Sequence, residues 1–425
     1  MQIVLTNATF IDWECLDFKV SHILVEEGSQ GKIHFIDQLP LTEELKKFIV
    51  IDCKGKFVTK SFACGHHHAY SALARGMPPP KKNPENFFEI LKYIWWTLDK
   101  CLDKEMIKAS ALATAMACAK NGVTFVIDHH ASPNYVNGSL EIIAAAFEKV
   151  GLSHLLCYEI SDRDGIEIAK NGLTETGNYL RKHQGLVGLH TSFTVGDETM
   201  KNAVDLSLKY NSGIHIHVAE DYYDQEECLK KHGLRVVERL EKHGVLDSEK
   251  TILAHCIHLN DHEKDIVKNS KVTVVQNMES NLNNKVGRFT GNGLSTNIMF
   301  GTDGMHSDML QSSKFAFFAG QQYDIIDYAE TYRRFRQVHH YIKKNNFNGD
   351  GENNLVVLDY DTPTEMNKEN FLSHFIFGIE SKHIQHVISS GKLIVKDGQI
   401  QTVNEEETLR FTKEAGRKLW DAMKK

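Results

Sequence analysis

The sequence predicts an α/β protein, in which a (β/α)8 TIM-like barrel is joined to a small composite β-sandwich domain built from both ends of the chain. Three observations lead to this prediction. Apolar runs alternate with amphipathic stretches through the middle, both ends read as short strands, and 425 residues are enough for one large domain plus a smaller one. The expected division is residues 1–60 plus 351–425 for the composite β domain and residues 61–350 for the barrel.

The two ends of the chain carry strand patterns. In the first 60 residues, apolar and β-branched residues alternate, and no helical period of useful length appears. The pattern returns at 354–361 and 383–403, where Lys396-Asp397-Gly398 between two apolar runs is a hairpin signal. We therefore expect the ends to pair into one domain. Residues 405–425 have the pattern of a charged amphipathic helix on the surface.

The middle of the chain contains repeated strand–helix units. Its apolar runs are continuous, as expected for parallel strands with both faces covered, and helix candidates such as 197–210 and 228–244 lie between them. Eight such units close into a barrel. The eight runs lie at 57–68, 122–128, 154–160, 185–190, 213–220, 251–259, 271–277 and 297–304.

Composition excludes several classes of protein. The net charge is −7, so the chain lacks the basic surface of a nucleic-acid-binding protein or of one that binds anionic membranes. No apolar stretch of about 18 residues could cross a bilayer, and the first residues do not have the pattern of a secretion signal. The eight cysteines are scattered, as expected for reduced thiols. We expect a cytoplasmic protein with a small-molecule substrate.

Histidine is unusually frequent, with 23 residues, and several histidines end the apolar runs. The C-terminal ends of parallel barrel strands meet at one mouth, where active sites lie. A lone histidine is more often packed or exposed than a metal ligand, but five strand ends in register predict a metal centre. The candidates are His66 to His68, His190, His217, His255 and Asp303.

The first strand and the fifth strand supply the strongest candidates. Alternate residues of a strand face the same side, so His66 and His68 can point into the mouth while His67 points away. His217 is a further candidate ligand, with His215 as a packed alternate. Glu220 follows His217 by three residues, a spacing that can place a carboxylate beside metal-bound water as a proton shuttle.

The residues that end the sixth and eighth strands have two possible roles each. His255 is either a fourth histidine ligand or a hydrogen-bond donor beside the metal water, and Asp303 is either a ligand that takes a proton from the water or part of a turn. Three or four protein ligands with an open position are typical of a catalytic metal, which lowers the pKa of bound water to ~7. Imidazole and carboxylate suit both zinc and iron.

Together these motifs resemble the amidohydrolase superfamily over nearly the whole chain, and in particular its mononuclear deaminase and chlorohydrolase (ATZ/TRZ-like) branch. The resemblance implies one divalent metal ion per subunit, zinc in the first place and iron as the alternative, because the fourth strand ends in His190 and not in a lysine. It also implies that Glu220 is the proton shuttle, that His255 orients water and polarises the reacting C–N unit, and that His190 contacts the substrate. The implied metal ligands are His66, His68, His217 and Asp303.

A closer resemblance is to the SsnA group of aminohydrolases. It rests on the segments at 128–133, 158–165, 301–304 and 307–309. The chain departs from the family pattern where Lys60-Ser61 and Cys64 precede the first histidines, and where the seventh strand ends with Gln276 and Met278 in place of histidine and proline. We expect these last two changes to affect substrate choice or to weaken the enzyme.

The loop after the first strand is a candidate substrate-binding element. Pro78 to Pro80 cannot extend a helix, and the helix expected next carries Trp95 and Trp96, which either pack it onto the barrel or form a lid over the mouth. Arg75 could hold a carboxylate or carbonyl of the substrate, or make a surface ion pair. Polar residues at the ends of the second and third strands either bind substrate or are exposed: Asp128, His129, His130, Glu159, Asp162, Arg163 and Asp164.

The sequence thus predicts a metal-dependent aminohydrolase that hydrolyses a non-peptide C–N bond, with deamination of a purine-, pyrimidine- or triazine-like heterocycle in the first place. Cyclic amide or imidazolone ring opening and dehalogenation could use the same site. An alternative outside the enzymes is a metal-binding protein without catalytic activity, and only the seventh-strand departures favour it. A barrel enzyme of this kind is expected to be a homo-oligomer.

Overall fold

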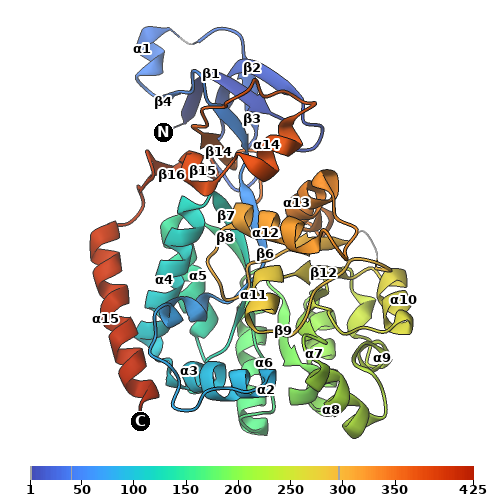
Figure 1. The fold of residues 1–425 in the computed structure, drawn as a ribbon. Helices are drawn as coiled ribbons and strands as arrows, with labels where there is room; N and C mark the ends of the chain where they lie inside the picture. The colour runs from blue at the N-terminus through green and yellow to red at the C-terminus, as the bar shows by residue number, and fades with distance from the viewer. Residues whose placement is uncertain (1, 40, 295–296) are drawn as a thin grey trace.

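The computed structural model of the protein describes residues 2–39, 41–294 and 297–425. Within these residues, the larger part is a barrel of eight parallel strands, and a second sheet lies at one end of it (Figure 1). The strands follow one another around the barrel in chain order. They are β6 (Phe62–His67), β7 (Val123–His130), β8 (Ser153–Tyr158), β9 (Val187–Thr191), β10 (Ile214–Val218), β11 (Ile252–His255), β12 (Thr273–Gln276) and β13 (Ile298–Phe300).

Within the described residues, the barrel is closed at two seams where the strands touch through isolated bridges. Leu156 bridges to Gly185 and Ile160 to Leu189 at the seam of β8 and β9, and His67 bridges to Asp303 between β6 and the residues after β13. Glycine permits the close approach at the second seam, since a Cβ on Gly301 would lie 2.8 Å from the backbone oxygen of His66. The closed parallel barrel confirms the predicted fold class.

Apolar side chains of the strands fill the barrel at the end away from the mouth. Inward-facing residues of most of the strands pack against Tyr341, in the last barrel helix, and Phe347, just after it. The polar strand ends therefore lie at the other end of a solid core. The inward-facing residues include Ala63, Phe125, Ile127, Leu155, Cys157, Ile252, Val275 and Met299.

Helices cover the outside of the barrel. The helix expected at 197–210 is confirmed as α7, but the one expected at 228–244 is two helices, because Gly233 takes a left-handed φ of 67° and ends α8. The covering helices are α4 (Lys104–Lys120), α5 (Ser139–Val150), α6 (Ile166–Leu180), α7 (Asp197–Lys209), α8 (Tyr222–His232), α9 (Val236–Lys242), α10 (Asp261–Asn269), α11 (Met278–Asn283), α12 (Met309–Gly320) and α13 (Tyr328–Lys344).

The second sheet joins both ends of the chain in one hydrogen-bonded network, in which β1 pairs with β2, β4 and β5. The expected hairpin turn is confirmed, with Asp397 and Gly398 both at positive φ between β16 and β17. The strands are β1 (Ile3–Ile11), β2 (Phe18–Val25), β3 (Ile33–Ile36), β4 (Ile49–Asp52), β5 (Phe57–Lys60), β14 (Leu355–Leu358), β15 (Ile384–Ser389), β16 (Lys392–Lys396) and β17 (Gln399–Ile400). Two short helices, α1 (Thr42–Leu45) and α14 (Phe371–Phe377), lie between these strands along the chain.

The run at 57–68 was expected to be one barrel strand, and this is wrong. It divides at Ser61: β5 belongs to the second sheet, and only β6 enters the barrel. The backbone N–H of Ser61 donates to the carbonyl of Asn354, while its hydroxyl lies 2.6 Å from that of Thr124, so this residue joins the two parts.

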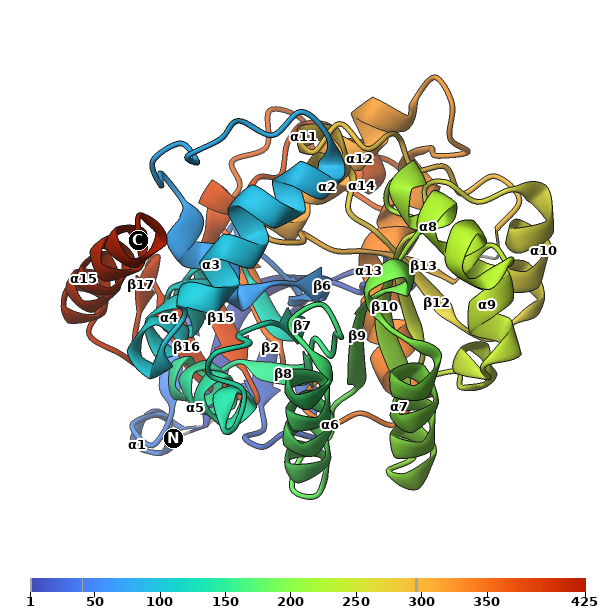
Figure 2. The same ribbon diagram turned by 90° about the horizontal axis from the view of Figure 1, so that it is seen from below.

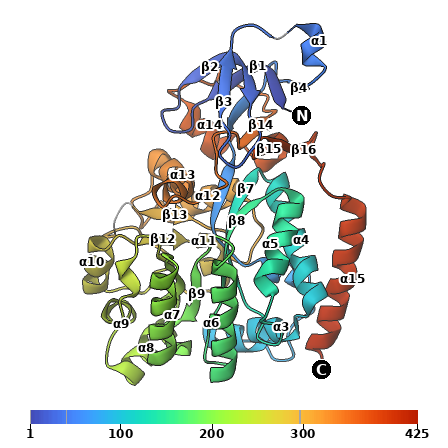
Figure 3. The same cartoon turned by 180° about the vertical axis from the view of Figure 1, so that it is seen from behind.

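The C-terminal helix α15 (Glu405–Met423) confirms the amphipathic helix expected at 405–425. It lies along the side of the barrel next to α4 and not on the second sheet (Figures 1 and 3). Trp420 donates its indole N–H to the carbonyl of Leu73, and Lys120 pairs with Glu405 at 2.7 Å. The division into 1–60 plus 351–425 and 61–350 stays a prediction.

The segment expected as an aromatic helix lies across the mouth of the barrel (Figure 2). It consists of α2 (Phe87–Ile90), a π-helical turn at Leu91–Trp95 and α3 (Trp96–Cys101). A π-helical turn is rare and is often found at functional sites. Among the described helices, none is long and apolar enough to cross a bilayer.

Candidate active site

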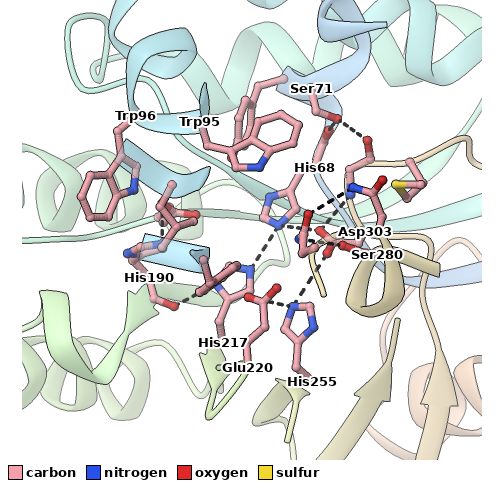
Figure 4. A pocket seen from close by; sticks show the side chains of 18 of the residues that line it. His68, Ser71, Trp95, Trp96, His190, His217, Glu220, His255, Ser280 and Asp303 are labelled. Atoms are coloured by element: carbon pink, nitrogen blue, oxygen red, sulfur yellow. Dashed lines mark hydrogen bonds and ion pairs between the residues drawn. The ribbon is translucent and has the colours of Figure 1, made fainter. Parts of the chain in front are cut away.

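A cavity lies at the C-terminal ends of the barrel strands, below the aromatic segment (Figure 4). Most of the residues predicted from the strand ends line it, and His66 lies fully buried beneath them. Trp95 and Trp96 lie across the cavity from Glu220 and His255 (Figure 4). The predicted residues in its wall are His68, His190, His217, Glu220, His255 and Asp303.

The four predicted metal ligands converge in this cavity. His68 Nε2 lies 3.1 Å from His217 Nε2 and 3.1 Å from Asp303 Oδ1, and His66 Nε2 lies 3.6 Å from the same oxygen. Two ligands of a tetrahedral ion with bonds of 2.0–2.1 Å are about 3.3 Å apart. These three distances, which link the four side chains through His68 and Asp303, fit one small divalent ion.

Hydrogen bonds orient the Nε2 atoms of His68 and His217 toward the proposed metal position. His68 Nδ1 lies 2.7 Å from the carbonyl of His129, and His217 Nδ1 lies 2.8 Å from the carbonyl of His190. A carbonyl can only accept, so each Nδ1 donates and the Nε2 lone pair is left for a metal. His66 Nδ1 lies 2.9 Å from His215 Nε2, which gives His215 the expected role of a packed partner.

The electrostatics of the site also suit a cation. Burial lowers the pKa of His66 to about 3, so this ring is neutral and able to bind a metal. Burial opposes the charge on His68 too, but the hydrogen bond to Asp303 and its charge raise the pKa of His68 to about 9. Burial alone would raise the pKa of Asp303, but His66 and His68 hold it well below its ordinary value. Positive charge is thus favoured between these side chains.

His255 and Glu220 lie beside the candidate ligands. His255 Nδ1 is 2.7 Å from Asn281 Oδ1, and its Nε2 lies 3.6 Å from Glu220 Oε2 and 3.8 Å from Asp303 Oδ2. Burial, with the nearby charge of Asp303, raises the pKa of Glu220 to about 7, although His255 works against the shift. A carboxyl group of this kind can both hold and release a proton near neutral pH.

The backbone is strained at two of these positions. His255 has a φ of 73° and Asp303 a φ of 53°, in the left-handed region that residues other than glycine rarely adopt. Strain of this kind costs of order 1–3 kcal/mol per residue and gathers at functional sites. The strain turns both side chains toward the cavity at the points where their strands end.

The third strand contributes charged residues that line the cavity with the tryptophans. Glu159 and Arg163 are both in its wall, and the Arg163 guanidinium lies 5.2 Å from the ring centre of Trp96. Arg163 also forms a buried ion pair with Asp99 of α3. This pair ties the aromatic segment to the barrel, and the sequence gives no signal for it because its partners are far apart in the chain.

Three side chains that the sequence singled out lie outside the described wall of the cavity. Arg75 is exposed, and its guanidinium donates a hydrogen bond to the carbonyl of Met305 at 2.7 Å. It lies outside the described wall of the cavity, because the 3₁₀ turn before it leads away from the mouth. The side-chain oxygen of Gln276 accepts a hydrogen bond from Arg334 at 2.8 Å, and Met278 is buried. Neither side chain is part of the described cavity wall. The seventh-strand departures therefore leave the wall unchanged at those positions.

Sequence reasoning also missed several residues of the wall. Ser280, Asn283, Asn284 and Met305 line the cavity from α11 and from the loop after Asp303. The surviving Ser280 and Asn281 of the seventh-strand motif were the available signal for this region. His67 points away from the mouth, as expected, with Nε2 2.7 Å from the Ser307 hydroxyl.

Comparisons with known proteins agree with the geometry. Residues 57–338 match the amidohydrolase family. A 5'-deoxyadenosine deaminase of Methanopyrus kandleri is 27% identical over 93% of this chain and 94% of that protein. A 5-methylthioadenosine/S-adenosylhomocysteine deaminase of Thermoanaerobacter pseudethanolicus is 26% identical over 87% of this chain and 88% of that protein.

Solved structures share the fold. An adenosine deaminase from Xanthomonas campestris with bound zinc superposes with a TM-score of 0.79, at 17% identity and over 98% of each chain. An atrazine chlorohydrolase from Arthrobacter aurescens in complex with zinc gives a TM-score of 0.79 at 15% identity, over 97% of this chain and all of that one. The predicted superfamily is confirmed, while the closer likeness to the SsnA group stays a prediction. The chain therefore belongs to the amidohydrolase family and is a hydrolase that acts on carbon–nitrogen bonds other than peptide bonds.

Proposed function

We propose that this hydrolase deaminates a polar nitrogen heterocycle with one divalent metal ion, zinc in the first place, held by His66, His68, His217 and Asp303. The observation that carries the proposal is that His66, His68 and Asp303 form one group at ligand spacing, with His217 Nε2 3.1 Å from His68 Nε2. Glu220 and His255 lie beside this group. The relatives named as deaminases of adenine nucleosides support the choice of reaction.

When bound, the ion would activate a water molecule as a nucleophile at neutral pH. Asp303, whose Oδ2 lies 3.8 Å from His255 Nε2, would accept one proton of that water. Glu220 would take the other proton of the water and pass it to the leaving nitrogen, for which its raised pKa is suited.

His255 stabilises the charge that develops on the substrate. Its Nε2 faces the carboxylates of Glu220 and Asp303, and Asn281 fixes the ring from the other side. His190 contacts the substrate from the fourth strand, below Trp96, whose ring centre lies 6.1 Å from its own. The aromatic rings supply a flat surface for a planar heterocycle.

The test is ammonia release by the zinc-loaded protein across aminopurines, aminopyrimidines, pterins and triazines. Ammonia release distinguishes deamination from ring opening and from dehalogenation, which use the same nucleophile. A substrate whose turnover is abolished by Glu220→Gln establishes the reaction. Hydrolysis of a cyclic amide or a chlorinated ring with no ammonia released would replace deamination by one of those reactions.

We also propose that the chain forms a homo-oligomer. Phe318 of α12 and Phe377 of α14 are 57% and 59% exposed, with ring centres 6.1 Å apart, and such a patch is typical of an interface. Light scattering should give a mass that is a multiple of 48.3 kDa, and Phe318→Ser should lower it. A monomer at micromolar concentration would refute this proposal.

A further inference from the structure

Glu159 is a buried carboxylate in the cavity wall that the proposed mechanism does not use. Its Oε2 lies 3.2 Å from His129 Nδ1. Its Oε1 lies 3.8 Å from an Arg163 terminal nitrogen and 3.9 Å from His190 Nε2, beyond hydrogen-bond distance from both. Because Glu159 lines the cavity and this oxygen has no donor of Arg163 or His190 within hydrogen-bond distance, it is free to accept a hydrogen bond from a bound molecule.

The neighbours of Glu159 are held in place and cannot move in to fill this gap. Arg163 is engaged by Asp99 and by Asp164, whose carboxylate lies 2.8 Å from the guanidinium Nε. His129 Nε2 lies 3.2 Å from two backbone carbonyls, those of Leu189 and His215, which fix its ring. Glu159 itself begins the turn after β8, with its backbone N–H bonded to the carbonyl of His130.

Glu159 also lies close to the reacting centre. A carboxylate oxygen of Glu159 is within 4.8 Å of one ring nitrogen of His68 and of one ring nitrogen of His217. Trp96 covers the same end of the cavity. A planar substrate could lie under the tryptophan with its reacting carbon next to the metal position. One edge of this substrate would then contact the carboxylate of Glu159.

The charges at this end of the cavity do not suit an anionic substrate group. Arg163 is the one guanidinium in the described wall, and two carboxylates, of Asp99 and Asp164, already pair with it. Apart from Glu220 and Asp303 at the proposed metal site, the other carboxylate in the described wall is that of Glu159. A carboxylate can only accept hydrogen bonds, so the edge of the substrate that it meets must donate.

We propose that Glu159 is a specificity-determining residue, which accepts a hydrogen bond from an N–H or O–H group of the substrate. The enzyme then selects uncharged heterocycles with a donor on that edge and rejects those with a carboxylate or only acceptors there. This inference rests on the proposed function for the position of the substrate. The donor is a ring N–H of the heterocycle or a hydroxyl of an attached sugar, and the test distinguishes the two.

The experiment uses two matched substrate pairs with the zinc-loaded protein. One pair is 5'-deoxyadenosine and its analogue without ribose hydroxyls, and the other is guanine and its ring N-methyl analogue. Glu159→Gln should lower kcat/KM by about 10- to 100-fold for the donor-bearing member of one pair, the size expected for a lost hydrogen bond to a charged group. The member without the donor should change by less than threefold, and the affected pair identifies the donor.

A matched control is Glu175→Gln. Glu175 is also a buried carboxylate, but it accepts from the backbone N–H groups of Gly138 and Leu140 away from the described cavity wall. This variant should leave both pairs unchanged within twofold. An equal loss on both members of each pair, or no loss at all, with Glu159→Gln would overturn the inference.

The outcome can be separated from failure of the proposed function. If the wild-type protein releases no ammonia from any of the four compounds, deamination of these substrates is refuted. Calorimetric binding of the same pairs to the wild type and to Glu159→Gln then decides the role of Glu159. Tighter binding of a donor-bearing compound that is lost in the variant supports the inference, and binding without that preference, or no binding, overturns it.

Discussion

Replacing Gly301 with alanine should weaken metal binding, although this residue is not a ligand. The added Cβ would lie 2.5 Å from Asn277 Oδ1 and 2.8 Å from both the Cβ and the backbone oxygen of His66. Ordinary contacts of a Cβ are 3.4–4 Å, so the neighbours must move by more than half an ångström. The crowding therefore affects His66, the first of the proposed metal ligands.

The effect should reach a second ligand through the backbone. The carbonyl of His66 accepts hydrogen bonds from the N–H groups of Thr302 and Asp303, each at 3.1 Å, so a shift of His66 also displaces Asp303. Overpacking of this kind costs about 1–3 kcal/mol. If the whole of that cost appears as a weaker free energy of zinc binding, the affinity for zinc falls by about 5- to 150-fold, since 1.4 kcal/mol corresponds to a tenfold change in affinity.

The assay is zinc competition against a chelator of known affinity, together with thermal unfolding with and without zinc. Gly416→Ala in α15 is the control, because its added Cβ meets nothing within 4 Å and alanine should stabilise the helix by about 0.5–1 kcal/mol. A Gly301→Ala protein that keeps its zinc affinity within twofold would refute the idea that this close contact positions His66.

The other predictions concern the proposed roles and the buried charges. Glu220→Gln should keep the metal but lower turnover by ~10²–10⁴, the usual contribution of a positioned acid or base, and unchanged ammonia release would remove Glu220 from the mechanism. His217→Ala should lose the metal, measured by elemental analysis after dialysis, while a full metal content would contradict its assignment as a ligand. Burial lowers the pKa of His339 to about 4, although Asp350 works against the shift, so the unfolded chain binds more protons than the folded one below about pH 6.5. The free energy of unfolding should therefore fall as the pH drops from 6.5 toward 4, by about 2 kcal/mol from this group at pH 5, and the fall should be shallower in His339→Gln. A wild-type slope equal to that of the variant would show that His339 is protonated equally in both states.

The strand ends could be predicted because a parallel barrel turns chain order into spatial order. Continuous apolar runs that end in His217, His255 and Asp303 place these side chains at one mouth whatever the loops do. The helix at 405–425 and the hairpin at Asp397 were predicted from local patterns, which tertiary contacts did not override. These signals lie within one element each.

The remainder depends on contacts between distant residues. The ion pair of Asp99 with Arg163 joins a loop helix to the third strand, and no periodicity marks it. The left-handed φ of His255 is set by the packing around the strand end, and glycine, the usual signal for such a conformation, is absent at that position. The sequence could not choose between the two positions considered for Arg75, because the direction of a 3₁₀ turn cannot be read from its distance in sequence to the histidines.

The central claim is that one metal-loaded site deaminates a heterocycle, and one measurement tests it most directly. The protein is loaded with one equivalent of zinc, and ammonia release is followed across aminopurines, aminopyrimidines, pterins and triazines, with Glu220→Gln measured beside the wild type. We predict ammonia from at least one class of compound, with Glu220→Gln retaining zinc and losing the activity. No ammonia from any class, with zinc shown to be bound, would contradict the claim.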